Sequence, residues 1–496
     1  MSKVSLAPTA LTAPSPRPGA SVPSTPGPSR PESVEMGPIS GGTSASPGET
    51  VEDPAEAARS LRESNIRSVI LCISSFLLVF TTCGTVFSFG VYQDLYQSMS
   101  REPGNPFTGA SPAAIDVIGT LSVAFMTIAA PLATAWTKRF SPRLVISLGT
   151  AFFFLSAMLA SWSTRLWQFI LTQGLMAGLG TCFAYMPAVT VAPTWYGPRR
   201  GLALGIIMSG TGVGGLVWAP ALQALNEAVG FRNALRISGA ISTGLLLVGG
   251  IFIDWDPVSK ARLEVENARL KAAAGKSWKY SLVSLWNVPL VDWRIARSSK
   301  FTAQLLASVL QSAAYYTPVF FFSAYAKTLG YSSKQGANFI AINNACNAIG
   351  KIAFGMIADR FGRINMLLFT TVISAIASFG FWLPSTLVPS LASGQGLFIA
   401  YSITYGIFAS AYVSLFPTSL VELFGPQNFA SVNGILYMAR GLATLFGTPT
   451  AGALLRGSDH HTDPSGYLHM AIMVGALLAG ASIGVVWVRI EWKRGP

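Results

Sequence analysis

NFIAINNACNAIGKIAFGMIADRFGR, from Asn338 to Arg363, is an apolar segment of membrane-spanning length that carries a lysine in its interior and ends in a charged loop. A charged side chain at the centre of a membrane span costs roughly 2.5–3.5 kcal/mol on insertion scales, so Lys351 predicts a functional site. Asn343, Asn347 and Lys351 are spaced four residues apart and therefore share one helix face. We expect this face to look into a polar cavity shared with other helices.

The composition is typical of a membrane protein with many spans. Of the 496 residues, 51% are hydrophobic and only 11% are charged, whereas soluble domains have about 25% charged residues. Apolar windows long enough to cross about 30 Å of hydrocarbon recur along nearly the whole chain. They are continuous and do not alternate, which disfavours a β-barrel. The sequence therefore predicts an all-α polytopic membrane protein.

The charges and the cysteines argue against several other classes. The formal net charge of +13 is carried largely by loops between apolar spans, so it is interpreted as a topology signal and no nucleic-acid partner is expected. The four cysteines lie inside apolar spans, so neither disulfides nor a bound metal are expected. No nucleophile–base pair or metal cluster suggests an enzyme, and no cofactor is expected.

Twelve apolar spans are predicted from hydropathy. They are Ser68–Tyr92, Ala113–Trp136, Leu144–Trp162, Trp167–Ala192, Leu202–Leu225, Ala234–Phe252, Phe301–Ala324, Asn338–Ile357, Asn365–Leu383, Gly396–Leu415, Ser431–Leu454 and Tyr467–Val488. On this layout most Lys and Arg residues gather on the side that holds both chain ends and the middle loop. The positive-inside rule then places both termini in the cytoplasm. The plasma membrane is the default location, and the vacuolar membrane is the alternative.

A middle loop divides the spans into six and six. The predicted segments are a disordered cytoplasmic tail at 1–65, a first half at 66–254, the middle loop at 255–300, a second half at 301–489 and a cytoplasmic end at 490–496. The halves also echo each other. LATAWTKRFSPR (Leu132–Arg143) corresponds to GMIADRFGR (Gly355–Arg363), and WYGPRRGLALG (Trp195–Gly205) corresponds to LFGPQNFASVNG (Leu423–Gly434). Two parallel repeats predict a substrate site between the halves near the membrane midplane.

From the first span to the last, these landmarks resemble the major facilitator superfamily, and within it the fungal branch of the monocarboxylate transporter family. The motifs are SFGVYQ at Ser88–Gln93, KRFSPR at Lys138–Arg143, YGPRRGLALGIIMSGTGVGG at Tyr196–Gly215, ADRFGR at Ala358–Arg363, and VELFGPQNFASVNG followed by GTPTAG at Gly447–Gly452. The resemblance implies two six-helix halves, secondary transport by alternating access, and proton coupling. The glycines of GTGVGG are expected to allow close helix packing.

The chain departs from that family at two places. Animal members that carry lactate-like acids have a lysine late in span one, where Val91 stands here. They also have an Asp and an Arg four residues apart in span eight, where Asn347 and Lys351 stand here. The positive charge is kept, and its carboxylate partner is not.

Two intramembrane cations suggest an anion site. Arg440 lies in a stripe with Asn433, Tyr437 and Thr444, and its guanidinium could hold a carboxylate bidentately or brace a neighbouring helix. Polar stripes in spans one, seven and ten add further candidates, for which interhelical hydrogen bonding is the alternative role. The candidate substrate-binding residues are Lys351, Arg440, Asn347, Asn343, Tyr437, Gln311, Tyr315, Thr85 and Tyr405.

A gate is implied by the resemblance. Asp359, Arg360 and Arg363 match the family's loop whose charge pairs latch the two halves in one state, and Arg139 is the corresponding residue of the first half. The first-half copy has Thr137–Lys138–Arg139 in place of the acid–base pair, so its latch is expected to be weaker.

The function predicted from these residues is secondary active transport of a small organic anion, a monocarboxylate or a carboxylate-bearing metabolite. The expected partners are that anion, protons and the lipid bilayer. One alternative is the export or import of a larger neutral or aromatic metabolite, which the tyrosines of span ten favour. A second alternative is a nutrient sensor that uses the same fold without transporting, although a sensor would usually carry a large cytoplasmic segment.

Overall fold

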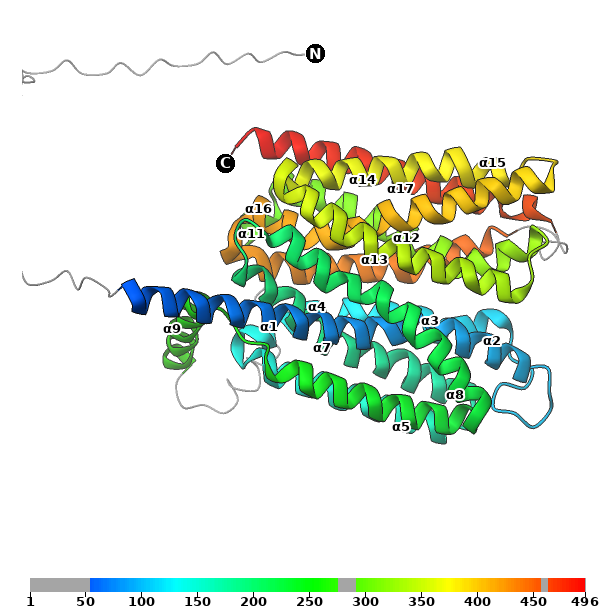
Figure 1. Cartoon of the computed structure of the whole chain (residues 1–496), viewed down its shortest axis with the longest axis horizontal. Coiled ribbons are helices and arrows are strands. Elements are labelled where there is room, and N and C mark those ends of the chain that lie inside the picture. The colour runs from blue at the N-terminus through cyan, green and yellow to red at the C-terminus, as the bar shows by residue number, and fades with distance from the viewer. Residues whose placement is uncertain (1–53, 275–290, 456–462, 496) are drawn as a thin grey trace, which may run out of the picture. The chain divides into compact units, whose positions relative to one another are not determined.

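The computed structural model describes residues 54–274, 291–455 and 463–495, and these residues are helical, with turns and short connections between the helices (Figure 1). The chain divides into Met1–Ala57 and Ala58–Pro496, and the following description concerns the second part. Most of the predicted tail and the centre of the predicted middle loop lie outside the described residues.

The first group of helices runs from α1 to α8. Its members are α1 (Pro54–Phe87), α2 (Phe89–Met99), α3 (Pro112–Ile128), α4 (Ala130–Arg139), α5 (Pro142–Trp162), α6 (Leu166–Phe169), the π-helix η1 (Ile170–Met176), α7 (Ala177–Trp195) and α8 (Arg200–Ile251). Helices α1 and α2 form one span that is interrupted at Ser88, and α3 and α4 form one span that is bent by 41°.

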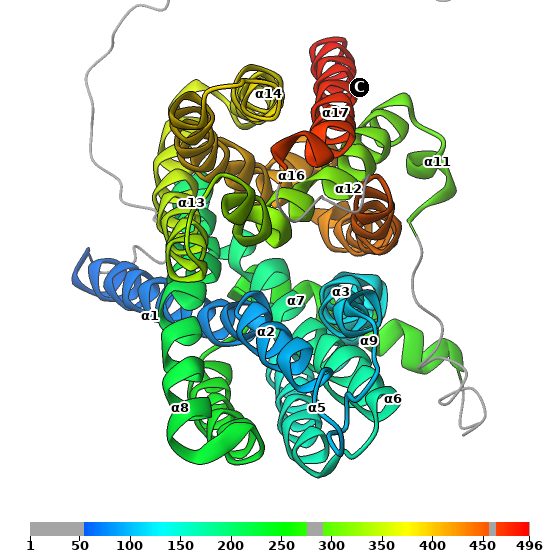
Figure 2. The same cartoon turned by 90° about the vertical axis from the view of Figure 1, so that its right-hand side faces the viewer.

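The second group of helices runs from α12 to α17. After α9 (Pro257–Ala274) and α11 (Trp293–Ala296) follow α12 (Ser299–Thr328), α13 (Ser333–Phe361), α14 (Arg363–Ala377), the π-helix η2 (Ser378–Trp382), α15 (Leu383–Ser385), α16 (Leu391–Ala453), the 3-10 helix η3 (Pro464–Tyr467) and α17 (Leu468–Lys493). Seen along the helices, the two groups lie side by side (Figure 2).

Two helices are too long to be single spans. Helices α8 and α16 contain 52 and 63 residues, which would extend about 78 Å and about 95 Å if straight. Each is broken by a glycine with positive φ, 77° at Gly230 and 75° at Gly425, a conformation that glycine adopts without steric cost. Among the described residues, nine helices, with α8 and α16 counted once each, and one bent pair are long and apolar enough to span. With α8 and α16 each divided, the described residues make twelve passes, which confirms the predicted all-α fold.

The two ends of the bundle differ. We call the end where α1 begins and α17 finishes the α9 end, and the opposite end, which carries α2 and α15, the α2 end (Figure 1). At the α9 end, α9 belongs to the predicted middle loop and is fastened to α4. Asn267 Nδ2 donates to the Lys138 carbonyl oxygen at 3.1 Å, and Trp255 Nε1 donates to the Thr137 carbonyl oxygen at 3.3 Å. These bonds satisfy carbonyls at the end of α4 that have no partner within the helix.

Helices α8 and α13 join the two groups by close backbone packing. A Cβ at Gly201 would lie 2.7 Å from Asp359 Oδ1, and one at Gly212 would lie 3.0 Å from the Ala348 nitrogen. Within the first group, a Cβ at Gly210 would lie 2.8 Å from the Phe76 carbonyl oxygen. The glycines of GTGVGG therefore serve the close helix packing that the sequence predicts.

The Gly212→Ala variant should be less stable than the wild type by about 1–3 kcal/mol, because its methyl group must push α8 away from the α13 backbone. Gly244→Ala is the control, in the second span of α8, where an added Cβ meets nothing within 4 Å. The free energy of unfolding of that control should exceed that of the wild type by about 0.8–1 kcal/mol, because alanine favours helix more than glycine does. The free energy of unfolding in mixed micelles measures both variants. Equal gains in the two would contradict the close-packing account.

Candidate functional site

A carboxylate on α13 closes the α9 end. Asp359 accepts hydrogen bonds from the backbone nitrogens of Gly201 and Leu202, both at 2.8 Å, at the first turn of α8. It also pairs with Arg363 at 3.1 Å, and Arg363 in turn reaches the Pro198 carbonyl oxygen at 3.3 Å. A helix N-terminus binds an anion through its free N–H groups and its dipole. These bonds, which we call the latch, join the second group to the first at this end.

The remaining predicted gate residues behave differently. Arg360 is exposed to solvent. Arg139 places its guanidinium 5.7 Å from the centre of the Phe140 ring. Its neighbour Lys138, which was not among the predicted gate residues, donates from Nζ to Ser431 Oγ on α16 at 3.1 Å. The first-group copy of the latch thus joins the two groups through a hydroxyl instead of a carboxylate.

Contacts between the groups are concentrated away from the α2 end. Among the described residues, the hydrogen bonds that join the two groups lie at the α9 end or in the central part of the helices. Deeper contacts include the Phe87 and Tyr316 rings, whose centroids are 5.8 Å apart. The structure is therefore a state that is closed at the α9 end.

Lys351 lies at the centre of a polar chain that crosses three helices. It is 1% exposed, and its Nζ donates to the Met208 carbonyl oxygen at 3.2 Å and to Thr211 Oγ1, both on α8. Thr211 is 3.5 Å from Asn347 Oδ1, and Asn347 Nδ2 donates to the Tyr315 hydroxyl on α12 at 3.1 Å. In this state the ammonium group is held by uncharged oxygens of the first group.

The Lys351→Met variant should fold with a stability close to wild type and lose transport by at least about tenfold, equivalent to about 1.4 kcal/mol. Replacing a buried charge with an apolar side chain of similar length is often neutral or stabilising. Thr211 would keep its hydrogen bond to the Met208 carbonyl oxygen at 2.9 Å. Lys327→Met, at an exposed position near the end of α12, is the control for both properties. If the Lys351→Met variant is destabilised, and transport falls only as far as the amount of folded protein falls, the role of Lys351 is structural alone.

Arg440 lies in an aromatic box on α16. Its guanidinium carbon is 4.7 Å from the centre of the Phe416 ring, 5.3 Å from that of Tyr412 and 5.7 Å from that of Tyr437. The side chain is 5% exposed, and its Nη1 has no hydrogen-bond partner among the described residues. Such a buried donor needs an explanation, and an acceptor on a ligand would supply one. The Tyr437 hydroxyl is 3.3 Å from that of Tyr185 on α7, so the box borders the first group.

The other predicted binding residues divide into three positions. Tyr405 donates to the Tyr315 carbonyl oxygen at 3.0 Å, which brings it to the polar chain. Gln311 and Asn343 are 1% and 2% exposed, and their side-chain oxygens have no partner among the described residues. Thr85 lies elsewhere, on the wall of a cavity formed entirely by the first group.

Three contributors were missed by sequence reasoning. Thr211 and the Met208 carbonyl face Lys351 from a glycine-rich stretch that signalled packing alone. Phe416 is an apolar residue in an apolar span, so its place beside Arg440 had no local signal. Within the described residues, the candidate binding residues thus comprise two buried cations, amide oxygens without partners and several aromatic rings, a set of groups suited to a planar, acidic ligand.

The comparisons with known proteins agree on one family. The profile of the Major Facilitator Superfamily matches residues 68–448. The agnestins efflux protein AgnL12 of Paecilomyces divaricatus is 26% identical over 429 residues, which cover 86% of this chain and 89% of that protein. The aspyridones efflux protein apdF of Emericella nidulans is 27% identical over 435 residues, covering 87% and 80%.

Solved structures support the fold. The proton:xylose symporter XylE bound to 6-bromo-6-deoxy-D-glucose aligns with a TM-score of 0.61 and 14% identity, over 87% of this chain and 97% of that one. A double tryptophan variant of XylE aligns with a TM-score of 0.65 and 16% identity, over 88% and 96%. At this level of identity the likeness concerns the arrangement of helices alone.

Proposed function

We propose that this chain, which belongs to the major facilitator superfamily, exports an aromatic metabolite that carries a carboxylate or another acidic oxygen. The chain is a membrane transporter of that superfamily and is not an enzyme. Its substrate would bind between the two groups of helices and move by alternating access.

The observation that carries the proposal is the Arg440 box. A guanidinium can bind an acidic group through two parallel hydrogen bonds, and the buried Nη1 of Arg440 has no hydrogen-bond partner among the described residues. The rings of Tyr412, Phe416 and Tyr437 offer stacking surface that a small aliphatic acid would leave unused. Two similar proteins are called efflux proteins, which supports export as the direction.

A small monocarboxylate is the second candidate, and Lys351 favours it. The motifs of the monocarboxylate transporter family and a lysine in span eight fit such an acid. For this substrate, the bonds of Lys351 to Met208 and Thr211 would have to break as α8 and α13 separate. We propose proton coupling for either substrate. XylE, whose structure is similar, is described as a proton:xylose symporter, which supports this proposal. We also propose that the α9 end and both termini are cytoplasmic and that the protein resides in the plasma membrane.

Transport into proteoliposomes distinguishes the candidates. The labelled panel would contain benzoate and hydroxybenzoate, the aliphatic acids lactate and pyruvate, and benzyl alcohol as a neutral aromatic of matched size. Each would be run with and without a pH gradient. The proposal expects the aromatic acids to move at least about tenfold faster than the others, a difference of about 1.4 kcal/mol in the barrier. If lactate is transported faster than the aromatic acids, the second candidate is favoured. If benzyl alcohol is transported faster, the substrate does not need an acidic group, which contradicts the proposal.

A further inference from the structure

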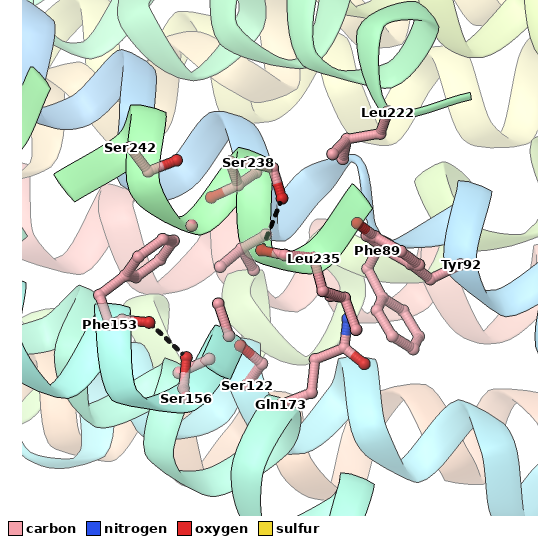
Figure 3. Close-up of a pocket in the computed structure, with 15 residues that line it drawn as sticks. Phe89, Tyr92, Ser122, Phe153, Ser156, Gln173, Leu222, Leu235, Ser238 and Ser242 are labelled. Carbon is pink, nitrogen blue, oxygen red and sulfur yellow. Dashed lines mark hydrogen bonds between the residues drawn. The ribbon is translucent and has the colours of Figure 1, made fainter. Parts of the chain in front are cut away.

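The first group contains a partly open cavity that is separate from the Arg440 box. It measures about 70 Å³ as the space open to the centres of water molecules, and residues of α1–α8 alone line it (Figure 3). One water needs about 10–15 Å³ of such space, so there is room for about five waters or one small organic molecule. A metabolite with several rings would not fit without rearrangement.

The lining is mainly apolar and uncharged, with several hydroxyl groups. Hydroxyl groups come from Thr85, Ser122, Ser156, Ser238 and Ser242. Aromatic rings and aliphatic side chains form most of the remaining wall, and none of the lining residues carries a charge. An ionised ligand would lose its hydration and find no opposite charge, so the chemistry of the wall selects neutral molecules.

Two buried hydroxyls on this wall lack a partner with good hydrogen-bond geometry among the described residues, and one of them, that of Tyr92, lies beside the Ser238 hydroxyl. Ser242 is 1% exposed and Tyr92 is 4% exposed. Neither Ser242 Oγ nor the Tyr92 hydroxyl has a partner that meets hydrogen-bond geometry among the described residues. Both residues project from the wall in Figure 3. Because buried hydroxyls normally have a hydrogen-bond partner, a ligand with a polar group would supply the missing hydrogen bonds.

The wall also contains two departures from regular α-helix. Phe89 and Tyr92 follow the interruption of the first span at Ser88, and Gln173 belongs to the π-helix η1. Short π-helical turns occur frequently at functional sites. Gln173 accepts a hydrogen bond from the Tyr96 hydroxyl at 2.9 Å, so α2, which follows the interruption, is joined to η1 beside the cavity.

From these observations we propose a second ligand site in this cavity, for a small neutral molecule that has a hydroxyl or carbonyl group on an apolar body. The interruption at Ser88 adjoins Phe87, whose ring contacts Tyr316 of the second group. Occupation of the cavity would therefore bias the contact between the groups. This inference is independent of the substrate proposed above, because its wall shares no residue with the Arg440 box.

The test uses three four-carbon probes of matched size: 1-butanol, butylammonium and butyrate. The full chain would carry Ser238→Cys, with the four native free thiols replaced by alanine. The rate of labelling by methyl methanethiosulfonate, a small neutral reagent, would be measured with each probe. Protection follows 1 + [L]/Kd, so 1-butanol at about four times its Kd should slow labelling about fivefold. Butylammonium and butyrate should leave the rate unchanged.

Controls separate a site from general access. Ser374→Cys, at a position in the second group that is 1% exposed and bonded to the Thr370 carbonyl oxygen, should show no protection by 1-butanol. Tyr92→Phe keeps the ring and should weaken protection severalfold. The wild-type chain gives a second readout, a saturable rise of its unfolding temperature with 1-butanol alone. Equal protection by all three probes, no labelling at all, or no saturable rise would each overturn the proposal.

Discussion

Asp359→Asn should shift the protein toward a state that is open at the α9 end by about 30- to 150-fold. The wild-type carboxylate accepts two backbone hydrogen bonds at the start of α8 and pairs with Arg363. Hydrogen bonds to a charged group contribute about 1.5–3 kcal/mol each, and the neutral amide can accept no more than part of them. A loss of about 2–3 kcal/mol corresponds to the expected shift.

Accessibility of a buried position at the same end measures this shift. Ala430 is 4% exposed and lines a small cavity between α4 and α16, so Ala430→Cys should react with a polar thiol reagent in the open state alone. The Asp359→Asn background should raise its reaction rate by the factor given above. Arg360→Gln is the matched control, because Arg360 is the next residue and is exposed. A rate that is unchanged by Asp359→Asn, or raised equally by the control, would contradict the latch.

Arg440→Lys should weaken binding of the transported acid by about 100-fold, although the charge is retained. Lysine cannot present the planar fork that holds an acidic group bidentately. Lysine therefore loses at least one charge-assisted hydrogen bond to the ligand, and a hydrogen bond to a charged group contributes about 1.5–3 kcal/mol. A loss near the upper end, about 3 kcal/mol, corresponds to about two powers of ten in Kd.

The dissociation constant of the transported acid, measured by calorimetry on the purified chain, checks this expectation. Arg297→Lys is a matched control, because its guanidinium lies 4.7 Å from the Trp293 ring at the surface of the second group. That variant makes the same exchange of guanidinium for ammonium over a ring outside the site and should bind as wild type. An Arg440→Lys variant with wild-type affinity would remove Arg440 from the binding site.

The fold was predictable because hydropathy and loop charge are properties of each segment of sequence and do not depend on which other segments it contacts. Each span needs about twenty apolar residues whatever its neighbours are, so twelve passes could be predicted without tertiary information. The turn between spans ten and eleven is a glycine followed by proline, Gly425–Pro426, as expected where a helix must break. The π-helices η1 and η2 were not predicted, because they depend on how neighbouring helices pack.

The site was predictable only in part, because spacing defines a helix face and not the helix that it meets. Lys351 and Asn347 share a face, as predicted, but their partner Thr211 comes from α8. Thr85 belongs to a regular polar stripe, yet this stripe contributes to the interior of the first group instead of the interface. Tyr412 and Arg440 are separated by the break at Gly425, so only the folded chain brings them together.

Paired spin-label distances test alternating access most directly. One pair would join Leu144 and Phe361 near the α9 end, and the other Trp167 and Leu387 near the α2 end; these four residues are 55%, 65%, 55% and 60% exposed. With Asp359→Asn, and with the transported acid, we expect the distance at the α9 end to lengthen while that at the α2 end shortens. Two distances that stay fixed under both conditions, or change in the same direction, would contradict a transporter that alternates about a central site.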